Sequence, residues 1–190
     1  MDARLCITAR NAKRLSDTFD ELVGVEHQQC IADLCNADSI AQLVESLPEL
    51  DGVVLCAGIV KTQPIKHIKE DALMDIFNTN ILSNIRLCTL LLKKRKLKHG
   101  ASIVMISSVS TFSVKVGNSL YSSTKGAMNS FAKAMALEVA PQKIRVNCIQ
   151  PGFVPTGILE NHGMADEAIQ WYADRHPLGF GTPTDIANAC

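Results

Sequence analysis

The sequence predicts an α/β fold with a doubly wound parallel sheet, and three observations lead to this class. Short apolar runs alternate along the chain with longer segments in which apolar residues recur at helical spacing. The strand-like runs are apolar throughout, as strands covered on both faces are. The 190 residues, without repeats or interdomain linkers, suit one domain with a buried core. We therefore predict a single domain over residues 1–190, with right-handed crossovers between its strands.

Five runs are expected as parallel strands, and four segments are expected as the helices between them. The strands are Leu5–Thr8, Gln29–Ala32, Gly52–Leu55, Ser102–Ile106 and Arg145–Ile149. The helices are Ala12–Leu22, Ser39–Leu47, Asp71–Lys98 and Tyr121–Ala140. Two asparagines, Asn80 and Asn84, interrupt the apolar stripe of the third helix. Pro141 ends the fourth helix, because proline cannot continue one.

Charge and composition exclude several classes of partner. The chain carries 19 Lys and Arg against 19 Asp and Glu, so its formal net charge is zero. A balanced chain has no electrostatic reason to bind nucleic acid or a membrane surface. Aromatic residues make up 5% of the chain, too few to form stacking platforms for single-stranded nucleic acid. We predict no nucleic-acid partner and no membrane partner.

The cysteines and histidines indicate a reducing compartment and no metal site. The seven cysteines contain no C-x-x-C pair, and the five histidines show no ligand spacing with them. Most of the cysteines lie in apolar runs, where a thiol acts as a small hydrophobic group. No stretch approaches the roughly 20 apolar residues of a membrane span, and the N-terminus lacks the apolar block of a signal peptide. We therefore expect a cytoplasmic protein.

A basic run, Lys93–Lys98, ends the third predicted helix and has two interpretations. It resembles a nuclear signal or a patch that docks an acidic carrier protein. The alternative is a solvated helix end, where cations complement the negative end of the helix dipole. We favour the helix end, since such basic runs are common.

The residues that carry chemistry follow the predicted strands. Ligands bind at the carboxyl ends of strands in a doubly wound sheet. Ser107 and Ser108 follow the fourth strand, and Tyr121 comes thirteen residues after Ser108. Lys125 comes four residues later, so the two side chains share one helix face. A Pro-Gly pair follows the fifth strand and makes a turn whose backbone can approach a ligand closely.

A phenol beside an ammonium and a serine suits the reduction of a carbonyl. Ionising a free tyrosine at pH 7 costs ~4 kcal/mol, and a nearby positive charge closes part of that gap. A carbonyl held by Ser108 and Tyr121 would be polarised and then protonated as a hydride arrives. A Tyr-x-x-x-Lys pair alone is common and so is a serine pair, so only their joint occurrence points to this function.

Four motifs in this order resemble the classical short-chain dehydrogenase/reductase family, which has a Rossmann-type fold. They are V-L-C-A-G, S-I-V-M-I-S-S-V-S, Y-S-S-T-K and R-V-N-C-I-Q-P-G-F-V-P-T, and the match to the family covers essentially the whole chain. The chain is most similar to the 3-oxoacyl-acyl-carrier-protein reductase-like branch. The resemblance implies that Tyr121 is the acid/base and that Ser108 orients the carbonyl. It also implies that Lys125 holds the nicotinamide ribose and lowers the pKa of Tyr121, and that Asn80 keeps a relay water.

The resemblance also implies a nicotinamide cofactor and the residues that hold it. Ala9 stands where members that prefer NAD carry an aspartate, and Arg10 follows it. A guanidinium matches the geometry of a 2′-phosphate, so we favour NADP over NAD. Asp33 and Leu34 match the pair that contacts the adenine. The remaining cofactor-binding positions, besides Tyr121 and Lys125, are Ala57, Gly58, Pro151, Gly152, Val154 and Thr156.

The chain departs from the family pattern in three places. Leu55 and Cys56 replace two asparagines, and Phe180 stands near the place of a loop arginine. No T-G-x-x-x-G-x-G segment occurs anywhere in the chain. The resemblance therefore predicts a fragment that lacks the first strand with its glycine-rich loop and the last strand. Such a chain would have a gap in its sheet and would bind NADPH weakly, and micromolar binding in a fluorescence titration would contradict this expectation.

The substrate and the assembly are predicted only broadly. Gly157–Arg175 is expected to form a substrate lid, with Met164, Ile169, Trp171 and Tyr172 either lining the pocket or simply packing the lid helix. The leading hypothesis is reduction of a small-molecule carbonyl, or oxidation of the corresponding alcohol, and a 3-oxoacyl thioester is one candidate carbonyl. The alternative is a catalytically impaired scaffolding subunit that keeps the fold and oligomer surface. Family members associate through two long helices, which implies a homodimer or homotetramer.

Overall fold

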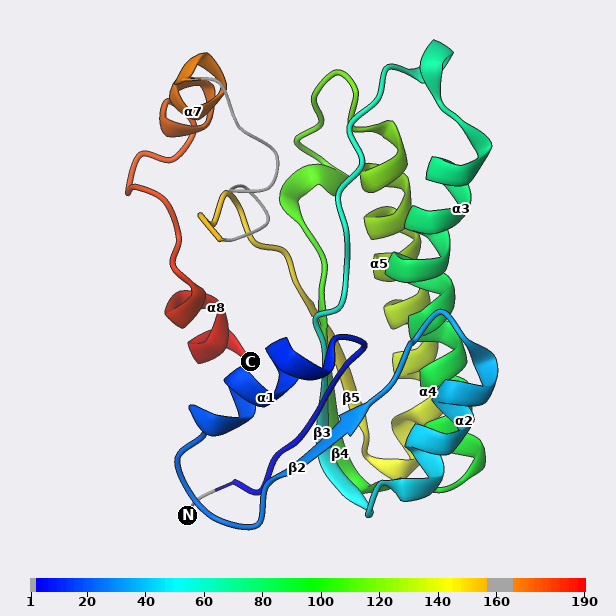
Figure 1. Cartoon of the computed structure of the whole chain (residues 1–190). Helices are drawn as coiled ribbons and strands as arrows, with labels where there is room; N and C mark the ends of the chain where they lie inside the picture. Colours follow the sequence, from blue (N-terminus) through cyan, green and yellow to red (C-terminus); the bar gives the residue numbers. More distant parts are fainter. Residues whose placement is uncertain (1–2, 157–165) are drawn as a thin grey trace. The chain divides into compact units, whose positions relative to one another are not determined.

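The computed structural model describes residues 3–156 and 166–190, and its parallel strands and helices confirm the α/β class. The chain divides into two compact units. The first comprises Met1–Asp51 with Leu82–Lys98, and the second comprises Gly52–Ile81 with His99–Cys190. The described strands form two sheets, with the orders β1-β2 and β3-β4-β5 (Figure 1). The sequence analysis predicts a doubly wound sheet with a gap, and the described strands form two separate sheets.

The first unit begins with a parallel strand pair and the helix that connects its strands. Strand β1 (Cys6–Ala9) pairs with β2 (Gln28–Ile31). Helix α1 (Ala12–Asp20) begins after Asn11, whose side chain accepts a hydrogen bond from a backbone N–H of the first turn. The helix ends two residues before the predicted Leu22, because the chain turns there toward a glycine at φ +123°.

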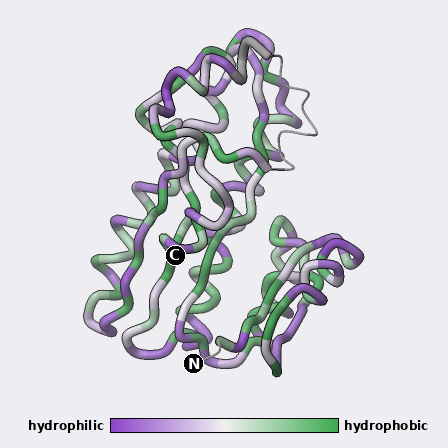
Figure 2. Tube along the Cα trace, turned by 90° about the vertical axis from the view of Figure 1, so that its left-hand side faces the viewer, coloured by the Kyte–Doolittle hydropathy of each residue, from purple (hydrophilic) through white to green (hydrophobic). Residues whose placement is uncertain are grey.

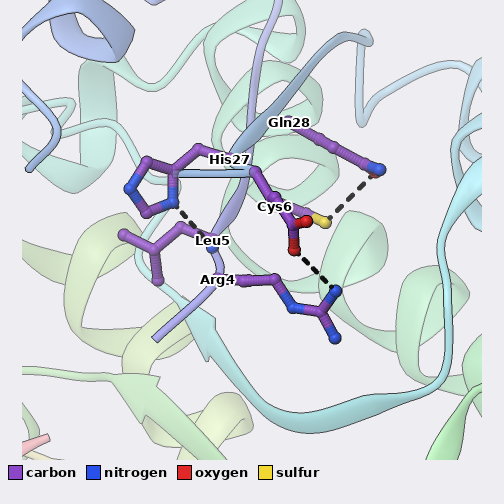
Figure 3. A network of polar contacts seen from close by, with 6 residues as sticks. Arg4, Leu5, Cys6, His27 and Gln28 are labelled. Atoms are coloured by element: carbon purple, nitrogen blue, oxygen red, sulfur yellow. Dashed lines mark hydrogen bonds and ion pairs between the residues drawn. The ribbon is translucent and has the colours of Figure 1, made fainter. Parts of the chain in front are cut away.

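A small polar network joins the starts of β1 and β2, as Figure 3 shows. The Arg4 guanidinium pairs with the Glu26 carboxylate at 3.0 Å, and both groups are exposed. The backbone N–H of Leu5 donates to Nδ1 of His27 at 3.1 Å. The Cys6 thiol lies 3.5 Å from the side-chain oxygen of Gln28. These contacts fix the strand register at its open end, where the pair has no further ladder.

Two further helices complete the first unit. Helix α2 (Ala37–Ser46) begins after Asn36, whose side chain accepts from the N–H of Ser39 at 2.9 Å. Helix α4 (Ser83–Lys93) packs against α2. The core of the unit consists of buried aliphatic side chains from its helices: Leu15, Ile40, Leu43, Val44, Leu87 and Leu91.

The basic run after α4 is largely used within the first unit. The Lys94 ammonium lies 3.2 Å from the Glu45 carboxylate, and Lys98 lies 2.9 Å from that of Asp51. Lys96 donates to two carbonyl oxygens at the end of α2, one of them that of Glu45 at 3.0 Å. These contacts favour the helix-end interpretation, although Lys96 serves the end of α2 rather than that of its own helix.

The second unit contains a three-stranded sheet and two packed helices. Its strands are β3 (Leu50–Leu55), β4 (Leu97–Ile106) and β5 (Arg145–Ile149). Strands β4 and β5 are parallel, from Ser102 opposite Arg145 to Ile106 opposite Ile149. Helix α3 (Glu70–Phe77) packs on α5 (Ser119–Val139), which also covers β5. Buried side chains from all three layers form its core, among them Ile76, Ile103, Met105 and Met128.

The long third helix of the sequence prediction is three elements in the structure. Helix α3 passes into a π-helical turn, Asn78–Leu82, and then into α4. The chain leaves α4 at Lys93, adopts a left-handed conformation at Arg95 with φ 53°, and starts β4 at Leu97. Strand β4 therefore begins five residues before the predicted Ser102. The sequence of the first half of β4 is polar and resembles that of a helix end, although Leu97 itself is buried.

The remaining described elements are three short turns and two helices that follow β5. Short 3-10 turns cover Ile65–His67, Val109–Thr111 and Ala140–Gln142, the last of which contains the Pro141 that ends α5. Helices α7 (Asp166–Ala173) and α8 (Pro183–Ala189) lie near the C-terminus (Figure 1). The alternation of hydrophobic and hydrophilic residues along the helices can be followed in Figure 2. No helix among the described residues is long and apolar enough to cross a membrane.

Candidate active site

Helix α5 brings the predicted Tyr121 and Lys125 together near its N-terminus. The two residues are one turn apart, and Nζ of Lys125 lies 5.6 Å from the centre of the Tyr121 ring. The phenol is half-buried, whereas the Lys125 side chain is 4% exposed. The predicted placement on one helix face is therefore confirmed.

Lys125 is a buried cation whose ammonium is anchored at the end of β4. Nζ donates to the carbonyl oxygen of Ile106 at 2.6 Å. Burial lowers the pKa of Lys125 to about 8, and the nearby thiols of Cys148 and Cys56 partly oppose this. At neutral pH the group is still mostly protonated, so the site holds one positive charge.

Tyr121 is held in its protonated form. Burial raises the pKa of the phenol, a hydrogen bond with Ser108 lowers it in part, and the nearby Tyr172 raises it. The sequence analysis expects Lys125 to lower this pKa, but the net direction here is upward and the lowering comes from Ser108. The reason is the loss of water around the ring, with the ammonium bonded to a carbonyl instead.

Ser108 lies where β4 ends and takes part in a chain of hydrogen bonds. It caps the short turn Val109–Thr111, and its hydroxyl accepts from the N–H of Ser110 at 3.1 Å. The hydroxyls of Ser108 and Ser110 are also 3.1 Å apart, and the Asn118 amide donates to Ser110 at 3.3 Å. The sequence analysis missed Ser110 and Asn118. The position of Ser110, two residues after the predicted serine, was the only signal that could have found it.

Asn80 lies in the π-helical turn and is completely buried. Its amide oxygen accepts from the N–H of Ile59 at 2.8 Å, and its amide nitrogen donates to the carbonyl of Ile59 at 2.9 Å. The same nitrogen lies 3.2 Å from the Thr124 hydroxyl, which donates to the carbonyl of Tyr121. Asn80 thus ties the loop after β3 to the helix turn that carries the tyrosine.

The segment after β5 continues alongside the end of β4. The N–H of Ser107 donates to the carbonyl of Ile149 at 2.8 Å, and that of Val109 donates to Pro151 at 3.1 Å. These bonds place Pro151 next to Ser108 in the backbone ladder. Gly152, Val154 and Thr156 follow, and Thr156 is exposed.

The loop after β3 leaves a small space beside the buried lysine. A Cβ on Gly58 would lie 3.3 Å from the Asn80 amide oxygen and 3.7 Å from Nζ of Lys125. A glycine there keeps that space free for a ligand atom next to a cation. Ala57 and Gly58 are half-buried, so their backbone can line it.

Three predicted cofactor residues, Arg10, Asp33 and Leu34, lie in the first unit. The Arg10 side chain is exposed, and within the described part of the chain it has no ion pair. The Asp33 carboxylate accepts from the N–H of Cys35 at 2.9 Å, which closes a turn after β2. Leu34 is half-buried.

The predicted lid is described only in part. Gly157–Ala165, with Met164, lies outside the described residues. Trp171 and Tyr172 lie on α7, with their rings in edge contact 5.0 Å apart. Tyr172 also influences the phenol of Tyr121 electrostatically, so this part of α7 faces the candidate site. Among the described residues, no group of three or more His, Cys, Asp or Glu side chains could hold a metal ion.

Comparisons with known proteins show which family and which relatives the chain resembles. A family model described as short chain dehydrogenase matches residues 1–167. The chain is 29% identical to carbonyl reductase family member 4 of Danio rerio, over 98% of this chain and 78% of that protein. It is 30% identical to a 3-oxoacyl-[acyl-carrier-protein] reductase of Mus musculus, with the same coverage. An uncharacterized oxidoreductase of Methylorubrum extorquens is 36% identical, over 97% of this chain and 77% of that protein.

Solved structures of reductases also resemble this chain. A variant of actinorhodin polyketide ketoreductase, determined with NADPH, superposes with a TM-score of 0.86 at 25% identity. It covers 98% of this chain and 78% of that chain. A dehydrogenase/reductase of Sinorhizobium meliloti superposes with a TM-score of 0.85 at 27% identity, over 98% of this chain and 75% of that one.

Proposed function

The chain belongs to the short chain dehydrogenase family of oxidoreductases, and on that premise we propose that it reduces a ketone to a secondary alcohol with NADPH. The observation that carries this proposal is the meeting of Ser108, Tyr121 and Lys125 at the carboxyl end of β4. Cofactor, substrate and direction are parts of the proposal, and each depends on its own residues.

We assign the acid to Tyr121 and the orientation of the carbonyl to Ser108. The raised pKa keeps the phenol protonated at neutral pH, which is the state that can donate a proton to a carbonyl oxygen. Ser108 hydrogen-bonds the same phenol, so its hydroxyl is close enough to share that oxygen. When bound, a reduced nicotinamide supplies the hydride.

Lys125 and Asn80 are assigned to the cofactor and to the return of the proton. The Lys125 ammonium borders the space at Gly58, where it would hold the ribose hydroxyls. Asn80 borders the same space and fixes the loop through Ile59, and a water kept there would connect the buried lysine with solvent. Ala57 and Gly58 are assigned to the ribose and pyrophosphate side, and the segment with Pro151, Gly152, Val154 and Thr156 is assigned to the nicotinamide side.

We favour NADP over NAD because of Arg10. Its exposed guanidinium directly follows β1 and has the shape to bind a 2′-phosphate bidentately. The ketoreductase neighbour determined with NADPH supports the same choice. Asp33 and Leu34 are assigned to the adenine.

The substrate is proposed as a small-molecule carbonyl, with 3-oxoacyl thioesters as the class to test first. The relatives named 3-oxoacyl-acyl-carrier-protein reductase and carbonyl reductase support this order. A homodimer or homotetramer is proposed by analogy with the family. A cytoplasmic location is proposed because all seven cysteines are free thiols.

Replacing Tyr121 by phenylalanine tests the proposal. We expect NADPH oxidation with a panel of 3-oxoacyl thioesters and small ketones, and a loss of about 10²–10⁴-fold in kcat for Tyr121→Phe. The other tyrosine of the chain, Tyr172, provides the matched control, and Tyr172→Phe should lose far less. Failure of the wild-type protein to oxidise NADPH with any carbonyl would contradict the proposal and favour a scaffolding subunit.

A further inference from the structure

We propose that His176 is a positioning residue that fastens the backbone after β5 to helix α7 and releases it on protonation. This inference rests on the proposed function, because Gly152–Val154 is the segment assigned there to the nicotinamide. The geometry itself involves only residues of the second unit.

Both ring nitrogens of His176 are used, and each use fixes a hydrogen. Nε2 accepts from the backbone N–H of Phe153 at 2.8 Å. Nδ1 lies 2.7 Å from the carbonyl oxygen of Tyr172, which can only accept. Nδ1 therefore carries the hydrogen and Nε2 has none, so the imidazole is neutral and in one tautomer.

Gly152 allows the imidazole to approach this closely. A Cβ on Gly152 would lie 2.6 Å from Nε2 of His176 and 3.3 Å from its Cδ2. Leaving its chain neighbours aside, the three atoms nearest to that position all belong to the same ring. The backbone of Gly152 is not left-handed, so an alanine is excluded by His176 and not by its own conformation. The glycine of the Pro-Gly pair and the histidine therefore act as a unit.

The imidazole is one of several contacts at Phe153. The N–H of Gly181 donates to the Phe153 carbonyl at 3.1 Å, so both backbone groups of Phe153 bond to the segment that follows α7. The Phe153 ring stacks on Tyr172 at 4.3 Å and contacts Phe180 at 4.7 Å. Ring packing can therefore hold α7 near the segment, while His176 is the acceptor that the described part of the chain gives to the Phe153 N–H.

Protonation removes the acceptor. A second hydrogen on Nε2 would point at the hydrogen of the Phe153 N–H, and that bond would be replaced by repulsion. The Tyr172 ring lies 6.4 Å from the imidazole, centre to centre, and Nζ of Lys115 lies 4.8 Å from the Tyr172 ring centre. Asp174 and Arg175 precede His176 in the chain, and their side chains bond to Gln170 and Trp171. The Gly152–Val154 segment has no ionisable side chain.

Two variants and one control test the role of the acceptor. His176→Gln keeps an acceptor oxygen at a similar reach to Nε2 but cannot be protonated there, and His176→Phe keeps the ring packing alone. The control is His27→Phe. His27 also uses both nitrogens, with the N–H of Leu5 and the carbonyl of Val23, but it lies in the first unit.

Hydrogen exchange of the Phe153 amide is the primary measurement, because it needs no cofactor. In the wild type we expect a protection factor that falls at least tenfold between about pH 8 and pH 5.5, the range in which histidine changes charge. His176→Phe should lack this protection at both pH values, whereas His176→Gln and His27→Phe should keep it at pH 8. Only His176→Gln should also keep it at the lower pH.

NADPH affinity is the second measurement. The affinity of His176→Phe should fall by about fivefold to tenfold, the effect of one hydrogen bond, and His176→Gln should restore most of it. If the wild type binds no NADPH but the exchange pattern holds, the proposed function fails and the role of His176 stands. Protection of Phe153 in His176→Phe, or equal behaviour of the Gln and Phe variants, would overturn the inference.

The glycine gives an independent test of the same contact. Gly152→Ala should remove the protection of Phe153, because its methyl group displaces the imidazole. Adding Gly152→Ala to His176→Phe should cost less than Gly152→Ala costs in the wild type, since the acceptor contact is already lost. Strictly additive losses would contradict the coupling of the two residues.

Discussion

Lys125 lies buried in the candidate site, and this burial lowers the stability of the folded chain while the lysine is charged. Its ammonium is nearly inaccessible to water, and burial lowers its pKa to about 8 from the ordinary lysine value of 10.5. Between these two values the unfolded chain binds more protons than the folded one. Because of this group, the free energy of unfolding therefore increases by about 3 kcal/mol in total as the pH rises from 8 to 10.5.

Comparison of the wild type with Lys125→Met measures this term. The stability of the wild type should improve relative to the variant by about 2–3 kcal/mol between pH 7 and pH 10, measured by urea unfolding at several pH values. Cys88, whose pKa burial raises to about 12, makes the opposite contribution above pH 9, but it is present in both proteins and cancels. Parallel pH profiles of the two proteins would show that the lysine is not held as described.

Much of the catalytic set could be predicted from the sequence, because its residues are tied to local structure. Ser108 follows a strand, and Tyr121 and Lys125 share a helix turn, so spacing alone brings them close. The direction of the Tyr121 pKa could not be predicted, because it depends on burial and on Tyr172, which is fifty-one residues away. His176 gave no local signal either, since its partner Phe153 precedes it by a whole lid segment.

At the scale of the elements, the C-terminal end of α2 is capped by Lys96, the residue that directly precedes β4. Lys96 is half-buried and donates to two carbonyl oxygens that the helix itself leaves without a partner. Its neighbour Lys94 makes an exposed ion pair with the side chain of Glu45 at the same helix end. The two lysines thus offer a matched comparison between a helix cap and a surface ion pair.

Replacement of each lysine by methionine tests this difference. Lys96→Met should lower the free energy of unfolding by about 1–2 kcal/mol, because two carbonyl groups, one of them partly buried, lose a charged donor. Lys94→Met should change it by less than about 0.5 kcal/mol, as exposed ion pairs contribute little. Urea unfolding of both variants under one buffer condition decides the question, and equal losses would contradict the capping role.

The elements also show where sequence patterns fail to predict the bounds of a helix or strand. Strand β5 has the predicted bounds, and α5 ends at the predicted proline, because both have strong local signals. The start of β4 was missed because Lys96 and Lys98 face partners in the first unit, so the pattern there is polar. The π-helical turn was expected only as an interruption of the stripe at Asn80, since the tertiary contacts of that amide select it.

At the scale of the whole molecule, the two units have separate cores. Leu43 is buried in the first unit, and Met128 is buried in the second. Truncating either side chain to alanine leaves a cavity that costs about 2–5 kcal/mol. We expect Leu43→Ala to raise hydrogen exchange mainly in residues 3–51 and 82–98, and Met128→Ala mainly in residues 52–81 and 99–156. Equal effects of both variants on all of these residues would show one cooperative unit.

Neither unit is a continuous piece of chain, and this has a consequence for biosynthesis. The chain passes from one unit to the other after Asp51, Ile81 and Lys98. The first unit is complete once Lys98 has left the ribosome, whereas Gly52–Ile81 must wait for partners translated later. At roughly 5–20 residues per second, the residues after Lys98 take about 5–20 s to make. For that interval the nascent chain holds a finished first unit beside an unpaired segment that already contains Asn80, so this segment is where a chaperone would be needed.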